Sequence, residues 1–285
     1  MDILVKKCRF RSIWDVLILK DFASNIALNQ NLKCTSMAKQ SGIIKLEGTI
    51  GDISFYKTQD GHLAREKGGV TADRIKSDPS FQRTRENGSE FGRAGAAGKL
   101  LRNAFRQLVQ PVADGRMVSR LTKEMLAVVK SDEDNFRGER NVQNGNVRLL
   151  KGFEFNINGL FSTTFYAPYE VTMDSATGAM KVAVPSFVPK NSVMAPAGAT
   201  HFMLVSAGAM IDFKNGAFTV VTSKSIGIEI DQMPTAAINL LNQLVPNTQQ
   251  RMFLVLGIEF YQEVNGFNYP IINGGFTSLA LVGVD

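Results

Sequence analysis

The character of the chain changes near Lys151, where a basic stretch punctuated by glycine gives way to one rich in phenylalanine and turn residues. Residues 1–151 carry 27 Lys and Arg against 17 Asp and Glu, whereas residues 152–285 carry 5 against 9. The net charge is therefore +10 in the first part and −4 in the second. Such an asymmetry indicates an anionic partner as one option for the first part. We expect two structurally different regions.

The length of 285 residues suits one large domain or two medium ones. The composition predicts a non-native or flexible extension, a basic β-hairpin and helical region, a linker and a β-sandwich domain, at 1–36, 37–130, 131–151 and 152–285. Met37 resembles a natural bacterial start, and an amphipathic N-terminal helix is the alternative for the residues before it. Both cysteines precede Met37, which excludes disulfides, thiolate metal sites and cysteine catalysis from there on.

The sequence also bears on membranes. The most apolar stretch, 13–28, is interrupted by Asp15, Lys20 and Asp21, so we expect neither a membrane span nor a signal peptide. The default expectation is therefore a cytoplasmic protein.

Short β-type runs follow Met37, at 43–46, 53–56 and 62–65. Asp60-Gly61 separates the last two, and Asp-Gly between β-type runs is a strong hairpin signal. This pattern predicts a small hairpin or three-stranded meander.

Helical patterns come next. Asp78-Pro79 is a good helix start, with Asp as N-cap. Glycines at 88, 92, 95 and 98 then leave two options, a continuous helix with a smooth stripe or a helix broken near Gly92. From Ala97 an amphipathic helix is clear, and Asp114 is the predicted cap of a second one. We expect the two helices to pack antiparallel.

After Lys151 the hydrophobic period changes to two. Asn215-Gly216 and Asn265-Gly266 resemble hairpin turns, and the run 252–256 is apolar on both faces, as in a central strand. Residues 237–241 are a strand candidate, with a short helix over 235–244 as the alternative. The predicted fold class is α+β: the small hairpin or meander and two amphipathic helices, followed by an antiparallel, immunoglobulin-like β-sandwich.

The sequence contains no complete motif for nucleotide binding, metal binding or catalysis. Gly92 to Leu100 resembles a phosphate loop, but Arg93 and Leu100 occupy positions where that loop needs Gly and Ser or Thr. His62 and His201 are the only histidines, and no metal-ligand spacing occurs. The run 132–134 begins like a calcium loop and does not continue as one, so we expect a solvated helix end. We expect no enzyme activity, cofactor, metal or small-molecule substrate.

Basic residues form the one candidate site with a physical rationale. Lys and Arg near glycines can neutralise phosphates, so nucleic-acid contact is the alternative function. Acidic neighbours such as Glu86 and Glu90 weaken the field, and a basic stripe opposite an apolar face is usually just solvated. The candidate contacts are Lys57, Arg65, Lys67, Arg83, Arg85, Arg93, Lys99, Arg102 and Arg106.

The segments 42–51, 54–57, 64–69 and 78–87, with 253–260 near the C-terminus, resemble a family of uncharacterised bacterial proteins. The resemblance runs from Met37 to the end. It implies no activity, substrate or catalytic residue.

Our leading expectation is a non-enzymatic structural or interaction protein. It would bind a protein partner, or assemble with itself, through the β-sandwich, with loops such as 185–198 as contact surfaces. The alternative is a nucleic-acid-binding protein that uses the basic N-terminal region.

Overall fold

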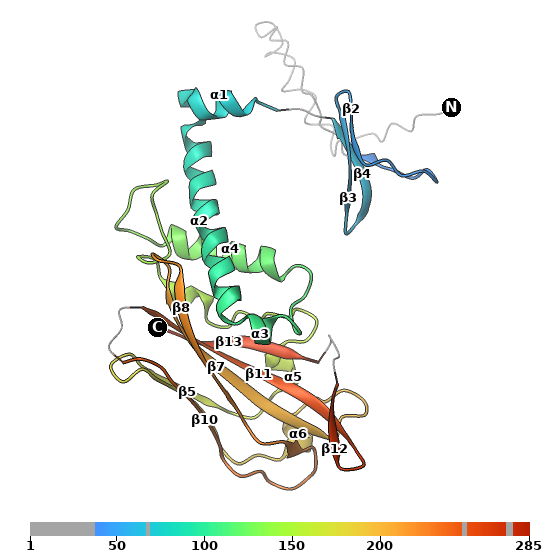
Figure 1. Ribbon diagram of the computed structural model, residues 1–285, viewed down its shortest axis with the longest axis vertical. Helices are drawn as coiled ribbons and strands as arrows, with labels where there is room; N and C mark the ends of the chain where they lie inside the picture. Colours follow the sequence, from blue (N-terminus) through green and yellow to red (C-terminus); the bar gives the residue numbers. More distant parts are fainter. Residues whose placement is uncertain (1–37, 67–68, 247–249, 272–275) are drawn as a thin grey trace, which may run out of the picture. The chain divides into compact units, whose positions relative to one another are not determined.

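The computed structural model describes residues 38–66, 69–246, 250–271 and 276–285 (Figure 1). The chain divides into two compact units between Thr71 and Ala72, and each is described by itself. The predicted extension 1–36 lies outside the described residues. Among the helices of the described part, none is both long and apolar enough to cross a membrane.

The first unit contains a four-stranded antiparallel sheet in the order β1-β4-β3-β2. Its strands are β1 (Ala38–Lys39), β2 (Gly48–Ile50), β3 (Ile53–Thr58) and β4 (Gly61–Glu66). The predicted hairpin is confirmed, because Asp60-Gly61 ends the turn between β3 and β4 and Gly61 has a φ of 117°. That conformation favours glycine.

The predicted strand at 43–46 is wrong. The Gln40 side chain closes this segment into a loop: Leu46 N–H donates to Gln40 Oε1 at 2.9 Å, and Gln40 Nε2 donates to the Leu46 carbonyl at 3.1 Å. The backbone of Leu46 is thus bonded to a side chain instead of a strand. The third strand of the meander is β2, a few residues later.

The second unit begins with the helices α1 (Ala72–Ser77), η2 (Pro79–Phe81), α2 (Gln82–Ala104), α3 (Arg106–Val109) and α4 (Met117–Lys130). The Asp78 N-cap is confirmed, since its carboxylate accepts the Ser80 N–H at 3.0 Å, although it caps the short η2 turn that leads into α2. Helix α2 is continuous, so the broken-helix alternative is wrong. Gly98 lies against Leu121 and Met125 of α4.

Two details of the helix pair differ from expectation. Arg116, not Asp114, is the N-cap of α4, and the Asp114 carboxylate instead accepts the Arg116 N–H at 2.7 Å. Figure 1 shows α4 lying across α2, so the prediction that the two helices pack antiparallel is also wrong. The intervening residues form α3 and a turn, which redirect the chain before α4 begins.

The predicted linker 131–151 is part of the second unit. Its side chains Val142, Val147 and Leu150 are buried in the core that the helices share with the sheet. The η3 turn (Val147–Leu150) lies within it. Buried aliphatic side chains hold this segment in place, so it does not separate two domains.

The described residues after 151 form nine strands and two short helices, α5 (Phe161–Thr164) and α6 (Pro189–Ser192). The strands are β5 (Glu170–Asp174), β6 (Ala179–Val184), β7 (His201–Asp212), β8 (Ala217–Lys224), β9 (Ile228–Glu229), β10 (Ile238–Gln243), β11 (Arg251–Val264), β12 (Phe267–Ile271) and β13 (Ser278–Val284). Three form a small sheet in the order β10-β6-β5. In the larger sheet β11 pairs with β7 on one side and with β12 and β13 on the other. Strands β8 and β9 both pair with the other edge of β7.

The predicted turns are confirmed. Residues 213–216 connect β7 and β8, and Asn265-Gly266 connects β11 and β12 with φ values of 54° and 81°. Residues 238–243 are a strand, so the helix alternative for 235–244 is wrong.

The second unit has three layers, with helices above the large sheet and the small sheet below it in Figure 1. One core lies between the helices and the large sheet, where Leu101 and Met125 pack with Phe253 and Val255. The other core lies between the two sheets, where Met180 and Val182 pack with Leu254 and Leu256. Residues 252–256 are thus buried on both faces, as predicted for a central strand. The coarse fold class, α+β with antiparallel sheets, is confirmed.

Candidate functional site

The predicted basic residues are divided between the two units of the chain. Lys57 and Arg65 lie on β3 and β4 of the first unit, and Lys67 lies outside the described residues. Arg83, Lys99 and Arg106 are exposed and Arg102 is half-buried on α2 and α3 of the second unit.

Two predicted residues stabilise the fold. The Arg85 guanidinium donates to the carbonyls of Ile75 and Asp78 at 2.7 and 2.9 Å, which ties α1 to α2. The Arg93 guanidinium donates to the carbonyls of Gly138 and Arg140, both at 2.7 Å, and so fixes the segment 131–151. These contacts use guanidinium N–H donors that would otherwise be available to a phosphate.

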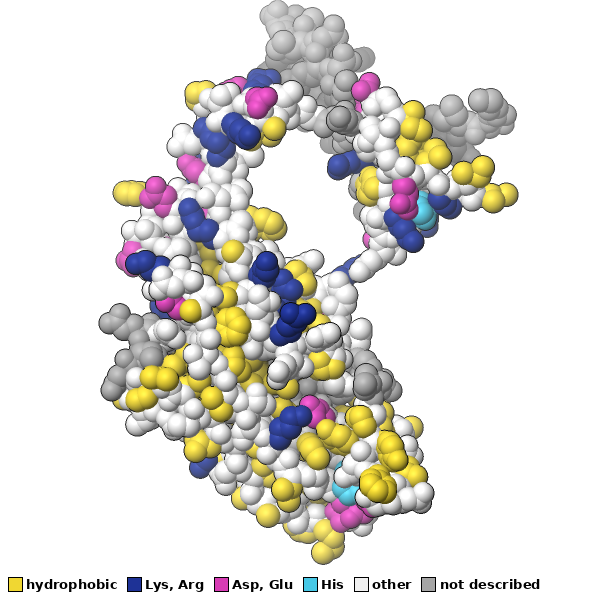
Figure 2. All heavy atoms as spheres, in the orientation of Figure 1, with side chains coloured by type: hydrophobic (Ala, Val, Ile, Leu, Met, Phe, Trp, Pro, Cys, Tyr) yellow, Lys and Arg dark blue, Asp and Glu magenta, His cyan; other side chains and the backbone are white. Residues whose placement is uncertain are grey.

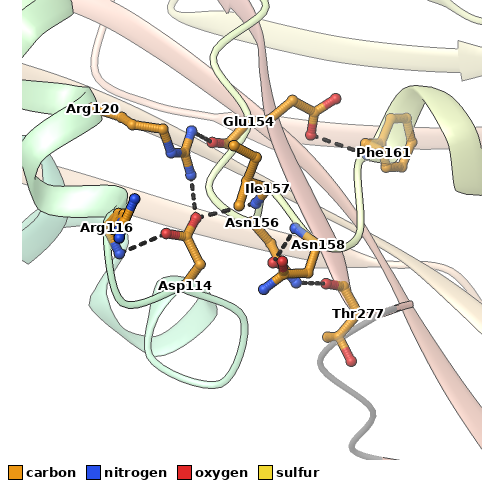
Figure 3. Close-up of polar contacts among 9 residues, drawn as sticks. All are labelled: Asp114, Arg116, Arg120, Glu154, Asn156, Ile157, Asn158, Phe161 and Thr277. Carbon is orange, nitrogen blue, oxygen red and sulfur yellow. Dashed lines mark hydrogen bonds and ion pairs between the residues drawn. The ribbon is translucent and has the colours of Figure 1, made fainter. Parts of the chain in front are cut away.

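A partly buried polar cluster joins α4 to the sheet (Figure 3). Asp114 pairs with Arg120 and also accepts the backbone N–H of Ile157 at 3.1 Å. Arg120 donates to the Glu154 carbonyl at 2.7 Å and lies over the Phe153 ring, 5.2 Å from its centre. Burial opposes the charge of Asp114, but the hydrogen bonds from Arg120, Arg116 and Ile157 outweigh it and lower the pKa of Asp114. The cluster is a structural connection.

Glu154 has a related role. Its carboxylate accepts the N–H groups of Phe161 and Ser162 at 3.0 and 3.3 Å and so caps α5. Burial raises the pKa of Glu154 and, with the Glu154 charge, the pKa of nearby Tyr169. Because both carboxylate oxygens accept backbone N–H groups, Glu154 has a structural role in the fold.

A cleft of about 210 Å³ opens on the large sheet beside the loop that follows α3. Glu259 and Tyr261 are its charged and aromatic polar groups. Tyr261 donates to Glu259 at 2.7 Å, and Lys224 Nζ lies 3.0 and 3.1 Å from the two Glu259 oxygens. Burial and then Glu259 raise the pKa of Tyr261 to about 12, which keeps the phenol protonated. This set is internally neutralised and supplies no poised acid or base.

Within the described ranges, no group of three or more His, Cys, Asp and Glu side chains is placed to hold a metal ion. Asp132, predicted as a solvated helix end, is instead buried, and its carboxylate accepts the N–H groups of Asp134, Asn135 and Asn141. It closes a loop with bonds that a metal would have to displace.

The four-stranded sheet has one apolar and one polar face. Side chains alternate along a strand, and cross-strand partners share a face. Ile53 pairs with Glu66 and Ile50, and Phe55 pairs with Ala64, so the isoleucines lie beside Phe55 and Ala64. The opposite face carries Thr49, Ser54 and Tyr56, with Arg65 over the Tyr56 ring. We call the first the apolar face: Ile50, Ile53, Phe55 and Ala64.

Nothing within residues 38–66 covers this apolar face. None of the residues 38–66 is buried, and Ile50 and Ile53 are 64% and 46% exposed. Ile43 and Ile44, at the tip of the Gln40 loop, are also exposed. Figure 2 shows hydrophobic side chains on the first unit, with charged side chains among them. The alternation Ile53-Ser54-Phe55-Tyr56 was a signal that could have identified this surface.

Comparisons with known proteins assign no family. No family model matches the chain, and no curated protein matches it. Among solved structures, the chain is similar to the reeler domain of human F-spondin, with 13% identity over 44% of this chain and 97% of that one and a TM-score of 0.16. At that score the similarity carries no argument. The resemblance to an uncharacterised bacterial family stays a prediction.

Proposed function

We propose that this chain is a non-enzymatic interaction protein and that its apolar face is the surface that docks on a protein partner. One observation carries the proposal: a four-stranded sheet with an apolar face has no buried residue within the described structure. Three or more strands are stable when a hydrophobic face is covered, and exposed apolar patches rimmed by polar residues mark interaction sites. The sandwich, which we expected to be the contact, has its inward-facing apolar residues packed between its two sheets and between the large sheet and the helices.

Site-specific photocrosslinking tests this function. A photoreactive residue replaces Ile53 in the full chain, within cells that naturally make it, and the control replaces Thr49 on the opposite face of the same sheet. We expect a protein crosslink from position 53 and a much weaker one from position 49. No crosslink from position 53, or equal crosslinking from both faces, would contradict the proposal.

Nucleic-acid binding is a second candidate. It is supported by the spacing of Lys99, Arg102 and Arg106, since no acidic residue occurs between Glu90 and Asp114. Replacing these three with glutamine should reduce affinity for single-stranded and duplex nucleic acid and flatten its salt dependence. Binding that is absent, or insensitive to salt, excludes this candidate.

We further infer that residues 152–285 form an immunoglobulin-like sandwich. The strand order supports it: immunoglobulin domains place strands A, B and E in one sheet and C, F and G in the other. In chain order, β5, β6 and β10 take the places of A, B and E, while β7, β11 and β13 take those of C, F and G. An experimental structure with another strand order would contradict this assignment.

A further inference from the structure

We infer that the partner of the apolar face is the same face of a second copy of this chain, related to the first by a two-fold axis. This inference rests on the proposed function, because it names the partner for the surface assigned there. It is argued from the charges that border the face.

The apolar face carries Lys57 at one end, where His62 and Glu47 also lie, and Glu66 at the other. Lys57 follows Ile53 and Phe55 at alternate positions of β3, so it extends the same face beyond Phe55. Glu66 pairs with Ile53 and therefore lies on that face at the opposite end. Both charged side chains are exposed.

A two-fold axis makes these ends complementary. If the axis runs across the strands at the Phe55–Ala64 pair, it reverses the strand direction of the second copy. The Lys57 end of each copy then meets the Glu66 end of the other, and the contact occurs twice by symmetry. Stacking the copies with strands in the same direction would instead bring Lys57 near Lys57, which like-charge repulsion disfavours.

The charge balance also favours a copy over a polyanion. The described sheet and its loops, 38–66, carry four basic residues (Lys39, Lys45, Lys57 and Arg65) and four acidic ones (Glu47, Asp52, Asp60 and Glu66). A protein surface that binds nucleic acid needs an excess of positive charge, which this sheet lacks. A neutral surface with Lys57 at one end and Glu66 at the other is complementary to a second copy of itself.

The test is a charge-reversal cycle on the full chain, with association measured by sedimentation velocity at about 0.1 M salt, where surface charges are only partly screened. Lys57→Glu and Glu66→Lys each replace two attractive contacts with two repulsive ones, so each should raise the dimer dissociation constant about tenfold or more. An equimolar mixture of the two variants should dimerise as the wild type does, because every contact between them is attractive. The double variant Lys57→Glu/Glu66→Lys should also recover dimerisation.

Recovery in the mixture shows that both variants are folded, which a loss of association alone would not show. Wild-type-like dimers of either single variant, or no recovery in the mixture, overturn the inference. A monomeric wild-type chain overturns it too. If position 53 then crosslinks to a different protein, the proposed function survives without this partner; if it crosslinks to none, both fail.

Discussion

Gly145 packs directly against the backbone of Val128: a Cβ atom on Gly145 would lie 2.2 Å from the Val128 carbonyl oxygen. The end of α4 and the segment 131–151 therefore touch with no room for a side chain. This contact is one reason that a polar, linker-like sequence is held in the core of the second unit.

Gly145→Ala should lower the free energy of unfolding by about 1–3 kcal/mol, because the added methyl group meets backbone atoms that cannot rotate away. Chemical denaturation of the variant and the wild type measures the difference. An unchanged midpoint would mean that the segment is not packed against α4 as described.

Gly92→Ala should act in the opposite direction. No atom lies within 4 Å of a Cβ built at Gly92, which is inside α2. Alanine should raise the free energy of unfolding by about 0.5–1 kcal/mol through helix propensity and lower unfolded-state entropy. The same denaturation experiment applies, with Gly88→Ala as a matched replicate. Destabilisation would show that something packs on this stripe.

Asp114→Asn should lower the free energy of unfolding at neutral pH. The variant should also lose less stability than the wild type when the solution is acidified. The pKa of Asp114 is held below its ordinary value of 3.8 in the folded state. Ionised Asp114 therefore stabilises the fold above that value, and the contribution is lost as the pH falls through the lower, folded-state pKa. Unfolding measured from neutral pH into strong acid should fall more steeply for the wild type. Parallel curves would rule out this role.

Glu154→Ala should cost about 1–3 kcal/mol, because the N–H groups of Phe161 and Ser162 lose their acceptor. Glu154→Gln retains an acceptor oxygen and is the control, with a smaller cost. The wild-type pKa is raised above 4.5, so the wild type should lose stability relative to Glu154→Gln as the pH rises through the raised, folded-state pKa. A larger loss for glutamine than for alanine would contradict the capping role.

Tyr261 should ionise later than a typical tyrosine, with a pKa near 12. Phenolate absorbance during a base titration measures it, and Tyr261→Phe identifies which part of the curve belongs to this residue. Glu259→Gln should move the pKa down toward the ordinary 10.0, since a negative neighbour disfavours phenolate. No shift on that substitution would show that burial alone sets the value.

Turn chemistry and alternation were enough to predict much of the β structure. Asn265-Gly266 and Asp60-Gly61 set their hairpins locally, because few residues adopt those backbone angles. The buried run 252–256 identified a strand covered on both faces. These signals lie within a few residues of the feature they predict.

The errors arose where distant contacts decide the structure. Leu46 is held by the side chain of Gln40, and the segment 131–151 by Arg93, and neither partner is visible as a local pattern. The basic residues were chosen by charge, yet Arg85 and Arg93 bind backbone carbonyls inside the fold. The apolar face was within reach of the sequence, because Ile53 and Phe55 alternate with polar residues.

The helices α2 and α4 bury their apolar sides against a sheet whose last strand is the end of the chain: Leu281 and Val284 of β13 pack in the same core as Leu101 and Met125. During synthesis, the helices emerge well over a hundred residues before the strand that completes their docking surface. At about 5–20 residues per second, they wait for many seconds with their apolar sides uncovered. A chain that stops before β13 keeps β7 and β11 beneath the helices but lacks Leu279, Leu281 and Val284, which belong to the same core.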